Sequence, residues 1–223
     1  MKNKILLIIF ILSFGINYAQ NWSLLEKIVS NDRTLMGYFG FSVAISGDFL
    51  FVGSVGETKD VSGENSLNLA GAVFIYKKNL SGSWAFHQKI VPSDRAANDR
   101  FGYSVAASGD YLIVSARDEA EDVNGNNTLF SAGSAYIFKN VEGTWTQVQK
   151  IVASDRGSGD WFGYAVGISG DYITVSALKE DENEIGEATE ADAGSAYIFK
   201  NTDGIWSQVK KIVASDRQWG DQF

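Results

Sequence analysis

The chain has 223 residues, of which 45% are hydrophobic, 13% are aromatic and 21% are charged, and it carries a formal net charge of −8 at pH 7. This apolar and aromatic content excludes a disordered chain and indicates a globular one. The negative charge argues against nucleic acid as a partner, because phosphate groups require a positively charged surface. The absence of cysteine excludes a disulfide framework and a thiolate metal site.

The first residues of the chain differ in character from everything that follows. Lys2 and Lys4 precede an apolar run over residues 5–12, and the small residue Ala19 is followed by polar Gln20. This pattern is typical of a secretory signal peptide that is cleaved after Ala19. Because the apolar run falls short of the ~20 residues that cross a bilayer, we expect no transmembrane segment in the mature chain. The sequence thus predicts a secreted or cell-surface protein.

Four sequence landmarks then recur at a nearly constant interval of 62 or 61 residues. They are the tryptophans Trp22, Trp84, Trp145 and Trp206; Phe-Gly at Phe39, Phe101 and Phe162, with Phe223 next; Ser-Gly-Asp at Ser46, Ser108 and Ser169; and Ala-Gly at Ala70, Ala132 and Ala193. A period of this kind is the signature of a repeat architecture. We divide the chain into a signal peptide (1–19), an N-terminal strand and linker (20–38) and three repeats (39–100, 101–161, 162–222). Phe223 then begins a fourth repeat, which predicts that the sequence is a fragment of a longer protein.

The predicted elements are all strands. Residues 22–29 match the last strand of a repeat, with no first three strands before them. In the second repeat we expect strands over 101–107, 111–116, 133–139 and 144–152, and Gly109-Asp110 between the first two predicts a tight hairpin. Four strands in series without a helical period predict an antiparallel meander.

The strands also change in polarity along each repeat. The second is almost continuously apolar, as expected when both faces of a sheet are covered, whereas the fourth mixes Thr, Gln and Lys with its Trp, as an edge strand does. This gradient predicts sheets stacked around an axis as the blades of a β-propeller. Tandem β-sandwiches are excluded because they need seven or more strands per domain.

The stretches "FGYSVAASGDYLIVSA", "SAGSAYIFKN" and "TWTQVQKIVASDR" resemble the FG-GAP repeat of integrin-α-type propellers, in the variety common in secreted bacterial proteins. The resemblance implies a seven-bladed propeller, of which three blades are present here, and a binding function at a cell surface. Integrin-type repeats often carry a calcium loop in the first hairpin. Ser-Gly-Asp stands in that place here and cannot supply the six to eight oxygens that calcium takes, so we expect no cofactor of this kind, and calcium stays a weak alternative.

Two kinds of polar residue have mainly structural interpretations. His87, the only histidine, occupies a position that is apolar in the other repeats, which favours a strand residue over a catalytic base. The four Asp-Arg pairs that begin at Asp32, Asp94, Asp155 and Asp216 occur in every copy. We interpret them as loop clamps, in which Arg bonds backbone carbonyls or a carboxylate such as Asp99 or Asp160.

Negative charge is concentrated in the long connection between the second and third strands of each repeat. Loop 1 (57–69), loop 2 (117–131) and loop 3 (179–192) have net charges of −2, −3 and −6. The candidate binding residues on this face are Asp118, Glu119, Asp122, Glu180, Asp181, Glu182 and Glu184. Asp122, Asn124 and Asn126 surround a glycine and form a weak candidate cation site without the closing acid of a calcium loop. The alternative interpretation is a solvated rim that keeps the protein soluble.

Two functions are consistent with these patterns. The first is a non-enzymatic extracellular binding or adhesion module that contacts a protein or glycan through its acidic face. The second is a propeller-type glycan lyase or hydrolase, or a domain attached to one. The sequence contains no nucleophile elbow, phosphate loop or metal-spaced histidine pair, and this favours the binding module.

Overall fold

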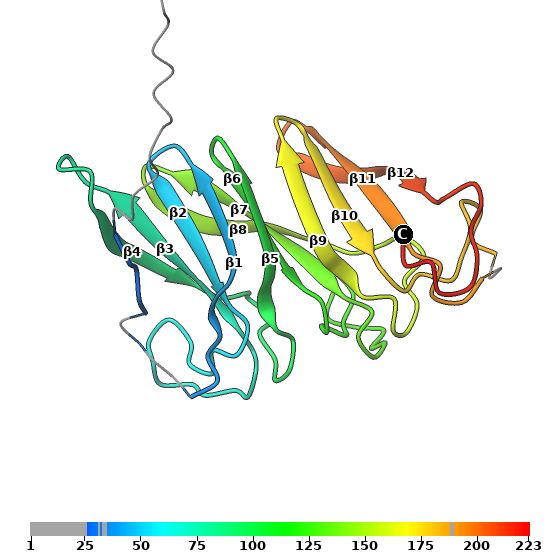
Figure 1. The fold of residues 1–223 in the computed structure, drawn as a ribbon, viewed down its shortest axis with the longest axis horizontal. Helices are drawn as coiled ribbons and strands as arrows, with labels where there is room; N and C mark the ends of the chain where they lie inside the picture. Colours follow the sequence, from blue (N-terminus) through cyan, green and yellow to red (C-terminus); the bar gives the residue numbers. More distant parts are fainter. Residues whose placement is uncertain (1–25, 31, 33–34, 188–189) are drawn as a thin grey trace, which may run out of the picture.

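The computed structural model describes residues 26–223 except 31, 33–34 and 188–189, and this part of the chain folds into three four-stranded antiparallel sheets (Figure 1). We call the sheets blades 1, 2 and 3. Blade 1 contains β1 (Phe39–Ser46), β2 (Phe49–Ser54), β3 (Ala72–Lys78) and β4 (Trp84–Ile90). Blade 2 contains β5 (Phe101–Ser108), β6 (Tyr111–Ala116), β7 (Ser134–Val141) and β8 (Thr144–Ile151). Blade 3 contains β9 (Phe162–Ser169), β10 (Tyr172–Ala177), β11 (Ser195–Thr202) and β12 (Ile205–Ile212).

Each blade is a meander in which consecutive strands are neighbours. In blade 2, Ser108 pairs with Tyr111, so that Gly109 and Asp110 form a two-residue hairpin turn. Gly109 has a φ of 57°, while Asp110 is not among the residues with positive φ. This agrees with a II′ turn, which needs glycine only at its first position. The predicted strands of the second repeat are confirmed to within two residues at each end.

Burial follows the polarity gradient in blade 2. In β6 every residue after Tyr111 is buried, whereas β8 alternates between buried or half-buried and exposed residues. In blade 2 the second and third strands have neighbouring strands at both edges and neighbouring blades at their faces. The fourth strand lies at the outer edge, where Thr144 and Thr146 face water and Gln147 and Gln149 are half-buried.

The first strands β1, β5 and β9 lie side by side, and the outer strands diverge (Figure 1). The Phe-Gly and Ala-Gly motifs join the blades. The amide of Phe101 donates to the carbonyl of Ala70 at 2.9 Å, and the amide of Phe162 donates to the carbonyl of Ala132 at 3.0 Å. The motifs that define the repeat therefore meet across each boundary between blades.

Apolar side chains fill both boundaries. Between blades 1 and 2, Phe51 and Ile75 pack with Phe101 and Trp145, and the Phe51 and Trp145 rings meet edge to face at 4.9 Å. An equivalent core between blades 2 and 3 includes Trp206. Stacked antiparallel sheets of this kind are the blades of a β-propeller, here an incomplete one, and the expected all-β fold is confirmed. No helix in the described part of the chain is long and apolar enough to cross a membrane.

The N-terminal segment lies where the last strand of a preceding blade would lie. Only residues 26–29 of the predicted strand 22–29 fall within the described part, and they are not assigned as strand. A strand requires a paired neighbour, and this segment instead makes isolated contacts: the amide of Trp84 donates to Glu26 Oε2 at 3.1 Å, and Ile28 packs on the outer face of blade 1. Gln88 and Gln149, which align with Glu26, bond Trp145 and Trp206 in the same way.

Candidate functional site

Loops 1, 2 and 3 lie at one end of the three sheets, together with the connections that lead from one blade to the next (Figure 1). We call this end the loop face. The hairpin turns within the blades lie at the opposite end. The loop face holds every acidic residue that the sequence predicted for binding.

A buried lysine pairs with two carboxylates at the base of each loop. In blade 2, Lys150 Nζ lies 2.7 Å from Asp94 Oδ2 and 3.0 Å from Glu119 Oε1. Asp94 belongs to the connection from blade 1, Glu119 to loop 2, and Lys150 to the fourth strand of blade 2. Only 7% of the lysine side chain and 3% of the glutamate side chain are exposed. This triad ties a long loop to its own blade and to the chain entering it.

The triad recurs in the other blades. Lys211 contacts Asp155 at 2.7 Å and Glu180 at 3.2 Å, and Tyr197 donates its hydroxyl to the same two acids. In blade 1, Lys89 contacts Asp32 at 3.3 Å and Glu57 at 3.4 Å. The sequence patterns did not connect these lysines with these glutamates, although each recurs at the repeat interval.

The triads divide the predicted acidic surface into buried and exposed members. Glu119 and Glu180 are 2% and 1% exposed and are held by lysines, so they are not available on the surface. Asp118 is also engaged, because its Oδ2 lies 3.0 Å from Arg117 and 3.3 Å from Arg100. Of the predicted binding residues, Asp181 and Glu184 are exposed.

Loop 3 carries most of the exposed charge. Glu182 is half-buried, and its pKa is raised by burial and by the neighbouring carboxylates of Glu180 and Asp155. Glu187 and Glu190 are exposed beside Asp181 and Glu184, although the sequence-based candidates did not include them. The signal that could have found them is the acid count of loop 3, which exceeds that of the other two loops.

The candidate cation site in loop 2 is a turn that binds its own backbone. Asp122 Oδ1 accepts the amides of Asn124 and Asn126 at 2.8 and 3.0 Å, and Oδ2 accepts the side-chain amide of Asn127 at 2.5 Å. These bonds lower the pKa of Asp122, and the two bonds from backbone amides have the largest effect. The Asp122 oxygens thus accept N–H groups of their own turn.

Within the described residues, one group of acids has the spacing of metal ligands. Carboxylate oxygens of Asp155, Glu180 and Glu182 lie within 4.8 Å of one another. Lys211 Nζ already contacts the first two of these acids. The ammonium group supplies the positive charge that a metal would otherwise bring, so the arrangement fits a structural ion-pair network better than a cation site.

The Asp-Arg pairs whose arginine lies in the described part of the chain act as the predicted loop clamps. Arg156 donates to the carbonyls of Asn127 at 3.2 Å and Ala120 at 2.7 Å, and Arg95 contacts the equivalent carbonyls of loop 1. Asp99 instead accepts the amide of Ala96 at 2.6 Å within its own connection. Burial raises the pKa of Asp99 to about 7, and that of Asp160 likewise to about 7.

His87 lies away from the loop face. Its ring is exposed, and its Nε2 lies 2.6 Å from the carbonyl oxygen of Gly143, a turn residue of blade 2. It therefore links the outer strands of two blades, in agreement with the structural interpretation. The predicted cleavage site at Ala19 lies outside the described residues.

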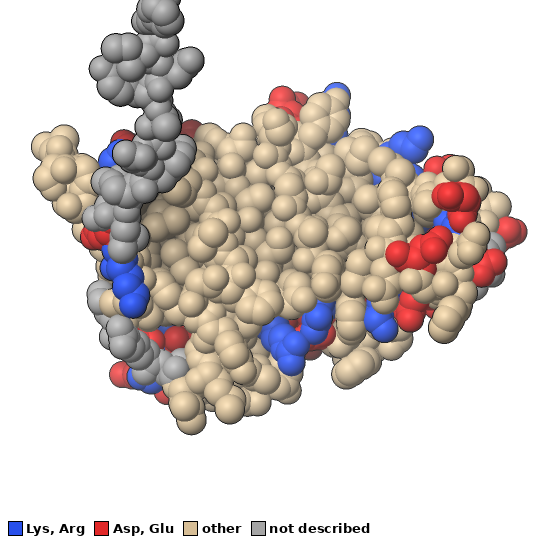
Figure 2. All heavy atoms as spheres, in the orientation of Figure 1, with Lys and Arg blue, Asp and Glu red and all other residues tan. Residues whose placement is uncertain are grey.

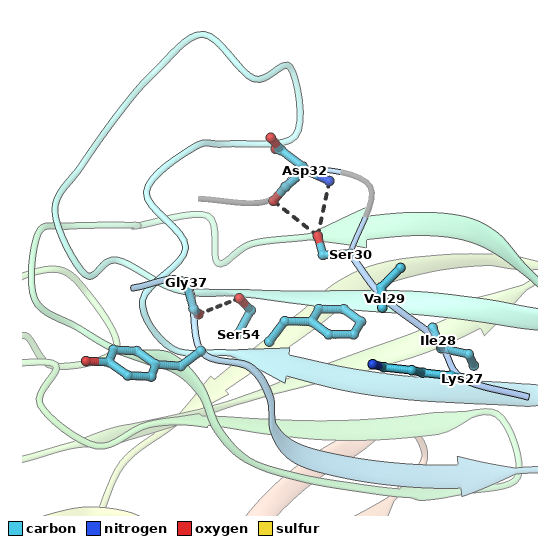
Figure 3. Close-up of a pocket in the computed structure, with 9 residues that line it drawn as sticks. Lys27, Ile28, Val29, Ser30, Asp32, Gly37 and Ser54 are labelled. Carbon is cyan, nitrogen blue, oxygen red and sulfur yellow. Dashed lines mark hydrogen bonds between the residues drawn. The ribbon is translucent and has the colours of Figure 1, made fainter. Parts of the chain in front are cut away.

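A cavity of about 350 Å³ opens beside blade 1 and receives the N-terminal segment (Figure 3). Lys27, Ile28 and Val29 run along it, and Ser54 Oγ donates to the carbonyl of Gly37 at 2.6 Å at its edge. Asp32, which also lines it, is engaged with Lys59 and Lys89. The cavity belongs to the packing of the N-terminal segment on the blade.

The stacked blades, the Phe-Gly to Ala-Gly contacts and the repeated triads define a β-propeller repeat protein. A family profile described as the FG-GAP repeat matches residues 22–76, 84–138 and 145–199, and the chain belongs to this family. The second and third matched units begin at the recurring Trp of a fourth strand, and all three units end in the third strand of a blade. The family unit therefore spans the boundary between two blades.

Similarity to individual proteins is weak. No curated protein matches the chain. Among solved structures it is similar to a protein described as a 6-phosphogluconolactonase from Bacteroides uniformis ATCC 8492, with 11% sequence identity and a TM-score of 0.37. That similarity covers 79% of this chain and 57% of the other, so the chain spans little more than half of that protein's length. A likeness of this strength carries no argument about this chain.

Proposed function

We propose that the chain is a non-enzymatic extracellular binding module that uses the exposed acids of loop 3 to contact a cationic region of a protein or glycan ligand at a cell surface. The observation that carries this proposal is the exposure of Asp181, Glu184, Glu187 and Glu190 within one loop. The single lysine of that loop, Lys179, pairs instead with Asp192 at 3.5 Å. A cluster of exposed like charges raises the local concentration of an oppositely charged partner and speeds its association.

The triad at the base of the loop supports this function. Lys211 holds Glu180 at one end of loop 3 with a side chain that is only 5% exposed. A fixed base presents the exposed acids without a large cost for ordering the backbone on binding. Extracellular placement rests on the signal peptide, which lies outside the described residues.

The same geometry favours a binding function over that of a glycan hydrolase or lyase. Hydrolysis of a glycosidic bond requires two carboxyl groups that face a shared space for the substrate. Within the described residues, Asp155, Glu180 and Glu182 have carboxylate oxygens within 4.8 Å of one another. Asp155 and Glu180 share Lys211 and the hydroxyl of Tyr197 instead. They are engaged in holding the blade together.

A charge-neutralised variant tests the proposal. The variant combines Asp181→Asn, Glu184→Gln, Glu187→Gln and Glu190→Gln. Its binding to heptalysine is measured by calorimetry at low and at physiological salt. We expect binding to the unmodified chain to weaken with salt, because exposed charges are screened over about 8–10 Å at physiological ionic strength. The variant should bind at least tenfold more weakly, with an unchanged melting temperature.

The matched control removes the same charge from the opposite end of the blades. Asp48, Asp110, Asp171 and Asp203 are exposed residues of the hairpin turns, and their combined change to Asn should leave heptalysine binding within about twofold. Equal losses in both variants would mean that only net charge matters. Unchanged binding in the loop 3 variant would refute the proposed surface.

A further inference from the structure

A second, apolar cavity lies at the inner edge of the loop face, between blades 1 and 2. It has a volume of about 270 Å³, and its lining is formed mainly by Met36, Tyr38, Phe41, Val55 and Leu69, together with Arg100 and Tyr103. Met36, Tyr38 and Phe41 are 65%, 56% and 49% exposed, so the cavity opens to solvent. None of these residues belongs to the acidic surface of loop 3.

The repeat supplies an internal comparison for this cavity. At the boundary between blades 2 and 3, Arg117 stands in the place of Val55, Tyr103 in the place of Phe41, and Trp161 in the place of Arg100. The Arg117 guanidinium lies 4.5 Å from the centre of the Tyr103 ring and 4.4 Å from that of Trp161. A flat side chain of the protein itself thus occupies the second boundary.

The first boundary has the same walls without that side chain. Val55 is too short to reach across and is itself buried at 5% exposure. Phe41 and Tyr103 lie against each other with ring centres 5.0 Å apart and form one wall. The space that Arg117 takes between blades 2 and 3 is therefore left open between blades 1 and 2, and it suits a flat apolar group.

The charge beside the cavity is locally positive in a negative protein. Asp118 pairs with both Arg100, through Nε at 3.3 Å, and Arg117, at 3.0 Å. Two guanidinium groups thus share one carboxylate, and the Arg100 side chain remains 39% exposed. In Figure 2 the surface over the inner strands is largely uncharged, with positive groups at its lower margin. Guanidinium binds carboxylate well because its N–H groups match the carboxylate geometry.

We propose that this cavity binds a small aromatic carboxylate, with the ring against the Phe41–Tyr103 wall and the carboxylate at Arg100. The cavity is slightly smaller than the ~300–1,000 Å³ of sites for drug-sized ligands, so it takes one ring and a short acidic arm. Such a group is found in free aromatic acids and at the C-terminus of a peptide that ends in phenylalanine. This site goes beyond the proposed function and does not depend on the acids of loop 3.

The test uses the full chain with 3-phenylpropanoate as the probe and calorimetry as the readout. We expect saturable binding of one equivalent, and at least tenfold weaker binding of 3-phenylpropan-1-ol, which keeps the ring and lacks the charge. The peptide Gly-Gly-Phe, as free acid and as amide, distinguishes the two sources. Preference for the peptide acid over 3-phenylpropanoate indicates a chain end, and the reverse preference indicates a free acid.

The variants use residues that the chain already tolerates at equivalent positions. Met36→Asn with Leu69→Ser copies Asn98 and Ser131, which stand one repeat interval later, and removes apolar lining. Arg100→Gln removes the charge. Each variant should weaken 3-phenylpropanoate binding at least tenfold. Val148→Thr, at a 47% exposed position of the outer strand β8, is the control and should leave binding within twofold.

A measurement on the unmodified chain keeps the proposal testable if a variant fails to fold. Amide resonances of residues near the cavity, such as Leu69 and Arg100, should shift on addition of 3-phenylpropanoate. Absent saturable binding, equal binding of the alcohol, or shifts confined to other parts of the chain would each overturn the proposal. The loop 3 variant should retain this binding, so failure here is distinguishable from failure of the proposed function.

Discussion

At the level of single residues, glycine determines how closely the blades approach each other. A Cβ atom on Gly133 would lie 2.0 Å from the carbonyl oxygen of Phe162 in the next blade. A Cβ on Gly102, the glycine of the Phe-Gly motif in blade 2, would lie 2.8 Å from the carbonyl oxygen of Ala72 in blade 1. Backbone atoms cannot move aside as a flexible side chain can, so the motifs exclude larger residues at these places.

Gly40 and Gly102 provide a matched test of this packing. They are equivalent residues with φ of 90° and 89°, but a Cβ on Gly40 would meet nothing within 4 Å. Both changes to Ala incur a similar backbone strain of about 1–2 kcal/mol. Gly102→Ala should lose about 1–3 kcal/mol more, because overpacking is added to the strain. Urea denaturation measures both losses, and equal losses would contradict the close approach.

At the level of elements, the lysine of each fourth strand holds a loop and an incoming connection in place. Lys150 belongs to an edge strand that is otherwise largely polar and half-exposed, yet its own side chain is only 7% exposed. The long loop 2 therefore has a fixed base although it has no strand of its own. The amino acids at the tips of the loops can therefore differ from one repeat to the next, as the acids of loop 3 do.

Removal of one charge from a triad should be costly. Lys150→Met should lower the free energy of unfolding by about 3–5 kcal/mol, because it leaves Glu119 buried without its partner. Adding Glu119→Gln should recover part of this loss. Lys139→Met, at an exposed position of β7, is the control and should change stability by at most about 0.5 kcal/mol. A similar effect of both lysine changes in denaturant melts would count against the triad.

At the level of the whole molecule, the blades differ in how many neighbours cover them. Ile113 and Ile137 of blade 2 are fully buried against blade 3. The equivalent Thr174 and Ile198 of blade 3 are exposed and half-buried, because no further blade covers that face within the described chain. Repeat proteins gain much of their stability from contacts between neighbouring units, so blade 2 should be the most stable part.

Hydrogen exchange on the full chain measures this difference. Amides of β6 and β7 should exchange more slowly than those of β10 and β11, because opening of blade 2 disrupts two boundaries and opening of blade 3 disrupts one. Amides of β9, the strand of blade 3 that packs on β5 and β6 of blade 2, should exchange at intermediate rates. Equal protection in blades 2 and 3 would indicate that the three sheets unfold as a single unit.

Much of this architecture could be predicted from the sequence because its information is local and repeated. Strand alternation, the Gly-Asp turns and the 61–62-residue period are all properties of short segments. The clamp role of the Asp-Arg pairs was also predictable, since Arg156 and its equivalents occur in every copy. Repetition by itself indicates a structural role, because a catalytic residue is needed once.

Whether each acid is buried or exposed was decided by the tertiary structure. Glu119 and Asp181 are both loop acids in sequence, but one is buried against Lys150 and the other is exposed. Lys150 lies about thirty residues beyond Glu119 and is brought to it by the return of the fourth strand. Likewise, the apolar cavity combines Val55 of one repeat with Tyr103 near the start of the next. The sequence by itself determined the strands and their order, because each depends on neighbouring residues. The burial of a charge and the shape of a cavity depend on residues that only packing between blades brings together.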